Sequence, residues 1–112
     1  MLFAFICVDK PDSIALRSKL RPPHLEYMIG VKDRTVFGGP LQDEPGEASL
    51  GSIFAIEFGS RAEAEAFLAE EPYNKGGLFQ STAIWRWRQM IPEVEEGQLL
   101  KLLERERANL GS

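Results

Sequence analysis

The stretch "IFAIEFGSRAEAEAFLAEEP", residues 53–72, is the most informative about the fold because a strand pattern in it passes directly into a helix pattern. Its first part alternates, with Phe54, Ile56 and Phe58 on one face and smaller or polar residues between them. This period of two is typical of a strand that buries one side against a core. We therefore predict a strand over about 53–58.

The second part of the same stretch favours a helix. Ser60 followed by Glu63 matches a capping box, in which each residue satisfies a free backbone N–H at the helix start. The residues after Ser60 are mostly Ala, Glu, Leu and Phe, and the first three are strong helix formers. Pro72 ends this helix because proline cannot continue the hydrogen-bond ladder.

The segments on either side of this stretch predict three more strands and two more helical regions. The strands fall at about 2–8, 35–41 and 81–90, and the helical regions at about 13–32 and 93–110. Pro22 and Pro23 interrupt the first helical region, so we expect two helical pieces hinged at the proline pair. The polar, Gly- and Pro-containing residues 41–51 predict the one long loop.

The order β-α-β-β-α-β plus a terminal helix predicts an α+β, ferredoxin-like fold with helices on one face of an antiparallel sheet. Trp85 and Trp87 share one side of the last strand, and Arg86 and Arg88 share the other. A second subunit's sheet is the natural cover for the tryptophans, which predicts a dimeric α/β barrel as a homodimer or higher homo-oligomer. We expect residues 1–92 to form the domain and 93–112 a helical extension.

Composition excludes several classes of function. The chain has 112 residues, a net charge of -4 and scattered basic residues, which argues against nucleic acid as a partner. Its apolar start is too short for a membrane span and lacks a positive flank, so we expect a cytoplasmic protein without a membrane partner. Cys7 is the single cysteine and has no His at metal-ligand spacing. We therefore expect no metal and no cofactor.

His24 is the only histidine and the first candidate for chemistry. If Pro23 begins a helix, His24 lies in its first turn, where the helix dipole favours a neutral ring that accepts a proton. It also leads a stripe with Tyr27, Met28 and Val31 that faces the sheet. The alternative is a half-buried histidine with a structural role only.

Glu71 is the second candidate. It ends a helix stripe with Ala64, Phe67 and Leu68, and a carboxylate on such a face needs a partner that a neighbouring histidine would supply. The alternative is a solvated, charged helix end.

A third group of residues predicts substrate contacts. Arg21 could hold an anionic group, Ser52 could donate a hydrogen bond, and Gly39 could let the backbone approach a ligand closely. Pro40 in "FGGPL" and Tyr73 in "EEPY" complete the predicted substrate-binding set. The alternatives are a bend in an edge strand and an ordinary surface arginine.

Taken in order, four segments resemble the YCII-related proteins, small dimeric α/β barrel proteins. These are "MLFAFICVDKPDS", "LRPPHLEYM", "VFGGPLQD" and "GSIFAIEFGSRAEAEAFLAEEPYNKGGLFQS", and they cover about residues 1–90. The resemblance implies a homodimer with a cleft in each subunit and a His–acid pair at His24 and Glu71. The family's acid is usually Asp, so Glu71, one methylene longer, is a departure.

Three hypotheses about function follow. The leading one is a small-molecule enzyme in which His24 and Glu71 carry out metal-free acid–base chemistry, of lyase or isomerase type, on a small oxygenated substrate. The second is a non-catalytic domain that binds a small ligand in a regulatory or stress-related role. The third is haem binding with His24 as the axial ligand, because dimeric α/β barrels include haem proteins.

Overall fold

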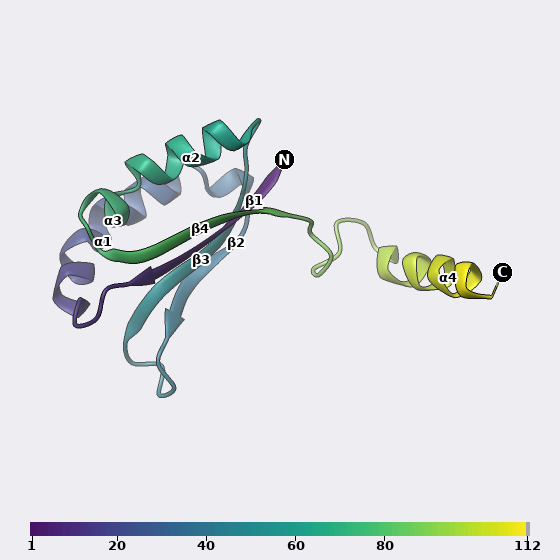
Figure 1. Ribbon diagram of the computed structural model, residues 1–112, viewed down its shortest axis with the longest axis horizontal. Helices are drawn as coiled ribbons and strands as arrows, with labels where there is room; N and C mark the ends of the chain where they lie inside the picture. The colour runs from purple at the N-terminus through teal and green to yellow at the C-terminus, as the bar shows by residue number, and fades with distance from the viewer. Residues whose placement is uncertain (112) are drawn as a thin grey trace.

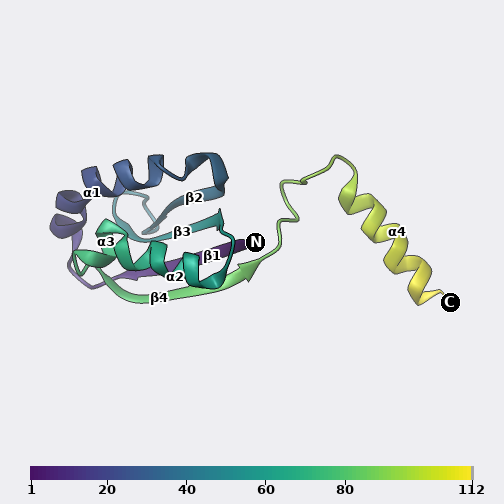
Figure 2. The same cartoon turned by 90° about the horizontal axis from the view of Figure 1, so that it is seen from above.

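A single antiparallel sheet of four strands, with helices on one face only, organises the computed structural model, which describes residues 1–111 (Figures 1 and 2). This confirms the predicted ferredoxin-like α+β fold. The elements are β1 (Leu2–Asp9), α1 (Ile14–Ile29), the 3₁₀ helix η1 (Lys32–Arg34), β2 (Thr35–Gln42), β3 (Ser49–Glu57), α2 (Arg61–Glu70), α3 (Pro72–Lys75), β4 (Phe79–Trp87) and α4 (Gln98–Leu110).

The core lies between the sheet and its helices. Strand order is β2-β3-β1-β4, so β1 is central, and Phe5 lies opposite Phe54 on β3 and Ile84 on β4. The Phe5 and Phe54 rings stack at 5.0 Å, and Phe67 of α2 packs on both. Burying each such side chain contributes about 1.5–3 kcal/mol, so the alternation in β3 and the apolar stripe of α2 fix the layer packing.

The capping box forms as predicted, except that Glu63 bonds to the backbone of Gly59 and not to that of Ser60. Ser60 accepts a hydrogen bond from the Glu63 backbone N–H at 3.2 Å, while the Glu63 carboxylate accepts from the Gly59 N–H at 2.6 Å. Helix α2 ends at Glu70, and Pro72 then begins the short helix α3, which the sequence patterns did not reveal. Proline fits there because the first helical N–H has no partner in any case.

The predicted hinge at Pro22 and Pro23 is wrong: α1 is one continuous helix that contains both prolines. The two missing N–H groups would have bonded to the carbonyls of Ser18 and Lys19. Both of those residues are exposed, so water can satisfy the freed carbonyls. His24 therefore lies inside a helix and not in its first turn, and the helix-dipole argument for a neutral imidazole does not apply.

Several boundaries also differ from the sequence expectations. Helix α1 ends at residue 29 and not 32, β4 spans 79–87 and not 81–90, and only 98–110 of the extension is helical. The loop between β2 and β3 shrinks to residues 43–48, because the Asp43 carboxylate accepts the N–H groups of Glu47 and Ala48 and closes a turn. The end of the predicted 93–112 extension, Ser112, lies outside the described residues.

The sheet face opposite the helices is left uncovered. Along β1 and β4 it presents Ile6, Val8, Trp85 and Trp87, and Trp85 is 63% exposed. Beyond β4 the chain leads away from the sheet to α4, which makes no layer with the rest of the domain (Figures 1 and 2). Within residues 1–111, no helix combines the length and apolar character that crossing a membrane requires.

Cys7, on the buried face of β1, yields a pH prediction. Burial, helped by the Glu71 and Asp9 charges, raises the pKa of its thiol from 9.0 to about 12. Between these values the folded chain binds more protons than the unfolded one, so the free energy of unfolding falls as pH rises. Denaturant titrations from pH 8.5 to 11 should show a shallower fall in Cys7→Ala than in wild type. Equal slopes would contradict the prediction.

Candidate active site

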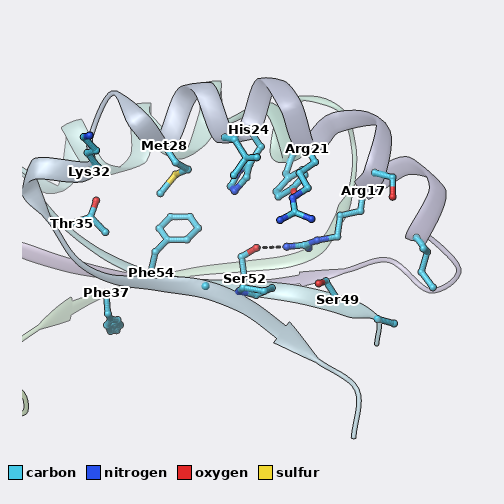
Figure 3. A pocket seen from close by; sticks show the side chains of 18 of the residues that line it. Arg17, Arg21, His24, Met28, Lys32, Thr35, Phe37, Ser49, Ser52 and Phe54 are labelled. Atoms are coloured by element: carbon cyan, nitrogen blue, oxygen red, sulfur yellow. Dashed lines mark hydrogen bonds between the residues drawn. The ribbon is translucent and has the colours of Figure 1, made fainter. Parts of the chain in front are cut away.

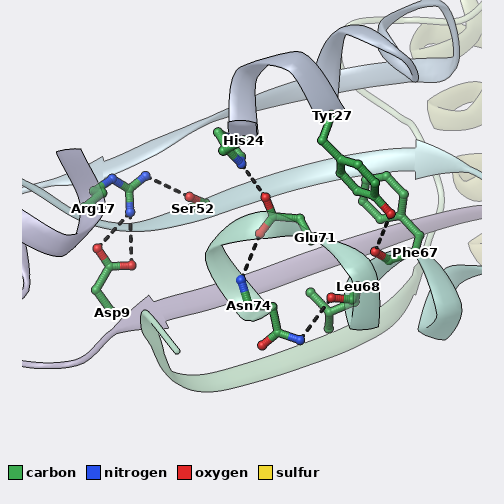
Figure 4. A network of polar contacts seen from close by, with 9 residues as sticks. All are labelled: Asp9, Arg17, His24, Tyr27, Ser52, Phe67, Leu68, Glu71 and Asn74. Atoms are coloured by element: carbon green, nitrogen blue, oxygen red, sulfur yellow. Dashed lines mark hydrogen bonds and ion pairs between the residues drawn. The ribbon is translucent and has the colours of Figure 1, made fainter. Parts of the chain in front are cut away.

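The two residues proposed as a pair are in direct contact. His24 Nδ1 on α1 lies 2.5 Å from Glu71 Oε1, although 47 residues separate them (Figure 4). The Glu71 side chain is completely buried, and its other oxygen accepts from the Asn74 backbone N–H at 3.3 Å as the N-cap of α3. Asn74 is held in turn by its side-chain bond to the Leu68 carbonyl at 3.0 Å. The Glu71 carboxylate is thus held in position by Asn74 independently of His24.

This contact determines which imidazole nitrogen is free. A carboxylate only accepts hydrogen bonds, so Glu71 selects the tautomer with hydrogen on Nδ1 and leaves a lone pair on Nε2. The imidazole stacks on the Tyr73 ring, with centroids 3.9 Å apart and planes inclined by 15°. Figure 3 shows the imidazole directed into a pocket. The arrangement therefore provides an oriented proton acceptor at a pocket wall.

The pocket, about 590 Å³ in volume, lies between α1 and the strands β2 and β3 (Figure 3). It is within the size range of small-molecule sites. The structure brings every predicted substrate-binding residue to its lining, together with His24: Arg21, Gly39, Pro40, Ser52 and Tyr73. Glu71 does not line the pocket, and it supports His24 from behind.

Arg17 also lines the pocket, and the sequence reasoning missed it. It precedes Arg21 and His24 on α1 by four and seven residues, a spacing that puts all three on one face of a helix. This spacing could have identified Arg17 from the sequence. Its Nη1 donates to both carboxylate oxygens of Asp9, at 3.0 and 2.8 Å, and its Nη2 donates to the Ser52 hydroxyl at 2.9 Å (Figure 4). Asp9 and Ser52 thereby fix a second charged group beside the dyad.

Glycines 38 and 39 contribute differently from expectation. A Cβ on Gly38 would lie 3.2 Å from the Phe54 Cβ on the pocket side of the sheet, whereas a Cβ on Gly39 would meet nothing within 4 Å. Gly39 contributes backbone to the lining, but the missing side chain of Gly38 is what keeps the pocket floor open.

This difference gives a matched pair of variants. Alanine at either position reduces the freedom of the unfolded chain, which stabilises by about 0.4–1 kcal/mol where the site accepts a Cβ. Gly39→Ala should show that gain. Gly38→Ala should lose it to the contact with Phe54, and so be less stable than Gly39→Ala by about 1 kcal/mol. Chemical denaturation of both variants measures the difference, and equal stabilities would show that Gly38 is not constrained.

The sheet, its one-sided helical layer and the pocket define a ferredoxin-like protein of the dimeric α/β barrel class, with a small-molecule-sized site. In the described part of the chain, no group of three or more His, Cys, Asp or Glu side chains could hold a metal ion. Residues 1–88 match the model of the YCII-related domain, and the chain belongs to this family.

Named relatives support this assignment. The chain is 31% identical over 91 residues to the proteins YciI of Escherichia coli O6:H1 and of Shigella flexneri, covering 75% of this chain and 93% of each relative. Among solved structures, it resembles 5-chloro-2-hydroxyhydroquinone dehydrochlorinase (TftG) from Burkholderia phenoliruptrix AC1100, in complex with 2,5-dihydroxybenzoquinone. That match has a TM-score of 0.76 and 29% identity, and covers 83% of this chain and 99% of the dehydrochlorinase. Helix α4 lies beyond the family match.

Proposed function

We propose that this protein is a small-molecule enzyme that carries out metal-free acid–base chemistry, of lyase or isomerase type, on a small oxygenated substrate. The observation that carries the proposal is the 2.5 Å contact between His24 and a completely buried Glu71 at the wall of a pocket. Glu71 is one methylene longer than the Asp that the resemblance implies at this position, and its side chain reaches the imidazole. The structural similarity to a dehydrochlorinase supports an elimination as the reaction class.

The proposed step begins with proton removal. His24 Nε2 takes a proton from a C–H or O–H bond of the substrate, and the bonding electron pair stays on the substrate and spreads onto a neighbouring oxygen. Glu71 stabilises the imidazolium that forms, because the carboxylate accepts its Nδ1–H. In an elimination the electron pair then expels a leaving group, and the imidazolium releases its proton to that group or to water. In an isomerisation His24 returns the proton to a different atom of the substrate.

A metabolite-library thermal-shift screen on the wild type and His24→Ala, followed by turnover assays on each stabilising compound, tests the proposal. We expect at least one compound that stabilises the wild type and is converted by it, with conversion lost in His24→Ala. Compounds that stabilise both proteins equally and are never converted would overturn the enzyme proposal in favour of a ligand-binding domain.

We propose further that two copies of the chain pack through their uncovered sheet faces. The support is the row of exposed apolar side chains on β1 and β4. If two copies pack face to face, each copy removes the other's apolar side chains from water. Ile91 and Val94, in the segment between β4 and α4, are also exposed. The extension would then enlarge the interface between copies.

Sedimentation analysis of Trp85→Asp tests the dimer. We expect the wild type to sediment as a dimer or larger homo-oligomer and Trp85→Asp to shift toward the monomer, since a carboxylate would replace an apolar contact at the interface. Thr82→Asp is the matched control, because Thr82 pairs with Cys7 on the opposite face of the sheet. A monomeric wild type, or an unchanged Trp85→Asp, would contradict the proposal.

A further inference from the structure

We propose that Arg17, Arg21 and Tyr73 form an anion-binding subsite beside His24, so that the substrate is a small organic anion bearing a carboxylate or phenolate oxygen. The inference deepens the proposed function and rests on it in one respect, namely that the pocket is the substrate site.

Arg17 has hydrogen-bond donors to spare inside the pocket. A guanidinium group carries five N–H bonds, and Arg17 contacts Asp9 and Ser52 through Nη1 and Nη2 only. The Nε–H and one Nη2 hydrogen have no partner among the described residues. Arg17 is 9% exposed and lines the pocket, so these donors are held rigidly at its wall. The ion pair with Asp9 fixes the orientation of the Arg17 guanidinium but also balances its charge.

The uncompensated positive charge comes from Arg21, one helical turn further along α1. Arg21 is exposed and makes no ion pair within residues 1–111. Figure 3 shows the guanidinium groups of Arg17 and Arg21 at the same end of the pocket. Asp9 balances the charge of Arg17, so the net positive charge at this end is that of Arg21, which a bound anion would neutralise.

The acidic side chains near the pocket do not cancel the positive charge of Arg21 at the pocket surface. Asp9 and Glu71 lie behind Arg17 and His24 and do not line the pocket. The acid that does line it, Glu47, is exposed and comes from the turn between β2 and β3. Lys32 adds a further positive charge to the lining. A ligand in the pocket therefore faces mainly cationic groups.

Tyr73 adds a neutral donor to the same end. Its hydroxyl makes no hydrogen bond in the described structure. No side-chain N or O of the described residues is both fully buried and without a partner, so the Tyr73 oxygen is not fully buried. It reaches the pocket that Tyr73 lines. Burial raises the pKa of Tyr73, while the Arg17 and Arg21 charges act in the opposite direction. The phenol is thus protonated at neutral pH and able to donate to an anion. The Arg17 guanidinium carbon lies 4.6 Å from the Tyr73 ring centroid, which places the two groups together.

The rest of the pocket fits a carbon skeleton. Leu25, Met28 and Phe54 provide an apolar wall next to the His24 imidazole. An anionic oxygen held by the arginines would orient the skeleton along this wall, with the atoms adjacent to the oxygen within reach of Nε2. Recognition and proton removal would then use neighbouring parts of one pocket.

Benzoate and benzamide, which share shape but differ in charge, serve as probes in calorimetric titrations of the full chain at low salt. We expect benzoate to bind at least about 10-fold more tightly than benzamide, the ratio that about 1.4 kcal/mol represents. Arg21→Gln should abolish this preference and Tyr73→Phe should reduce it. Lys19→Gln, which removes a charge from the exposed face of the same helix, should leave it unchanged.

Equal binding of the two probes by the wild type, or a preference that survives Arg21→Gln, would overturn the subsite. Either result would leave the proposed function standing if turnover still depended on His24. Conversely, a charge preference that depends on Arg21 in a protein without His24-dependent turnover would support the subsite and overturn the enzyme proposal.

Discussion

His24→Asn should lower kcat/KM for the converted substrate by about 10²–10⁴-fold, the usual contribution of a positioned general base. The asparagine amide can still donate a hydrogen bond to Glu71, so the buried carboxylate keeps a partner and the fold is retained. The variant has no basic nitrogen where Nε2 stood, and proton removal therefore loses its acceptor. Steady-state kinetics on a substrate found by the screen measures the effect.

Two comparisons make this result specific. Glu26→Gln changes an exposed residue of the same helix and should leave kcat/KM unchanged. His24→Ala should be as inactive as His24→Asn but less stable, because Glu71 then keeps only its bond from Asn74 in a fully buried position. If His24→Asn retained most of the wild-type activity, His24 would not be the base.

Arg17→Met should destabilise the fold by about 3–5 kcal/mol, the range for removing one partner of a buried ion pair. The Arg17–Asp9 pair has side chains 11% and 5% exposed, and the substitution would leave the Asp9 carboxylate without its two hydrogen bonds. A typical domain has a total stability of about 5–15 kcal/mol, so a loss of this size is readily measured by chemical denaturation.

The double variant Asp9→Leu/Arg17→Met should cost less than Arg17→Met alone, since no unpaired charge remains buried. Glu65→Gln provides the exposed counterpart: it breaks the surface pair with Arg61 and should cost under about 1 kcal/mol. A small effect of Arg17→Met, similar to that of Glu65→Gln, would show that the buried pair does not hold the pocket wall.

The fold followed from patterns that depend on near neighbours. The alternation through Phe54 and Phe58 and the capping residues Ser60 and Glu63 each describe one element, and their order along the chain is enough to define the topology. The hinge at Pro22 and Pro23 failed because proline rules are local, whereas α1 is held by tertiary contacts on both sides of the pair, from Arg17 to Asp9 and from His24 to Glu71. The four-residue helix α3 is too short to show a periodic pattern.

The site was only partly predictable for a related reason. His24 and Glu71 stood out individually because each is a polar group on an apolar stripe, yet only the fold shows that they meet. Arg17 did not stand out, since its role depends on Asp9 and on Ser52, 35 residues away, which no spacing rule connects. The support for His24 also comes from a different source than the sequence indicated, a carboxylate and not a helix terminus.

The dyad can be tested most directly by ¹⁵N NMR of the imidazole, since His24 is the only histidine and its signals need no assignment. At a pH where the ring is neutral, we predict hydrogen on Nδ1, a free lone pair on Nε2, and a downfield Nδ1 proton that moves upfield in Glu71→Gln, where a neutral amide is the weaker acceptor. Hydrogen on Nε2, or a spectrum that Glu71→Gln leaves unchanged, would contradict the His24–Glu71 dyad.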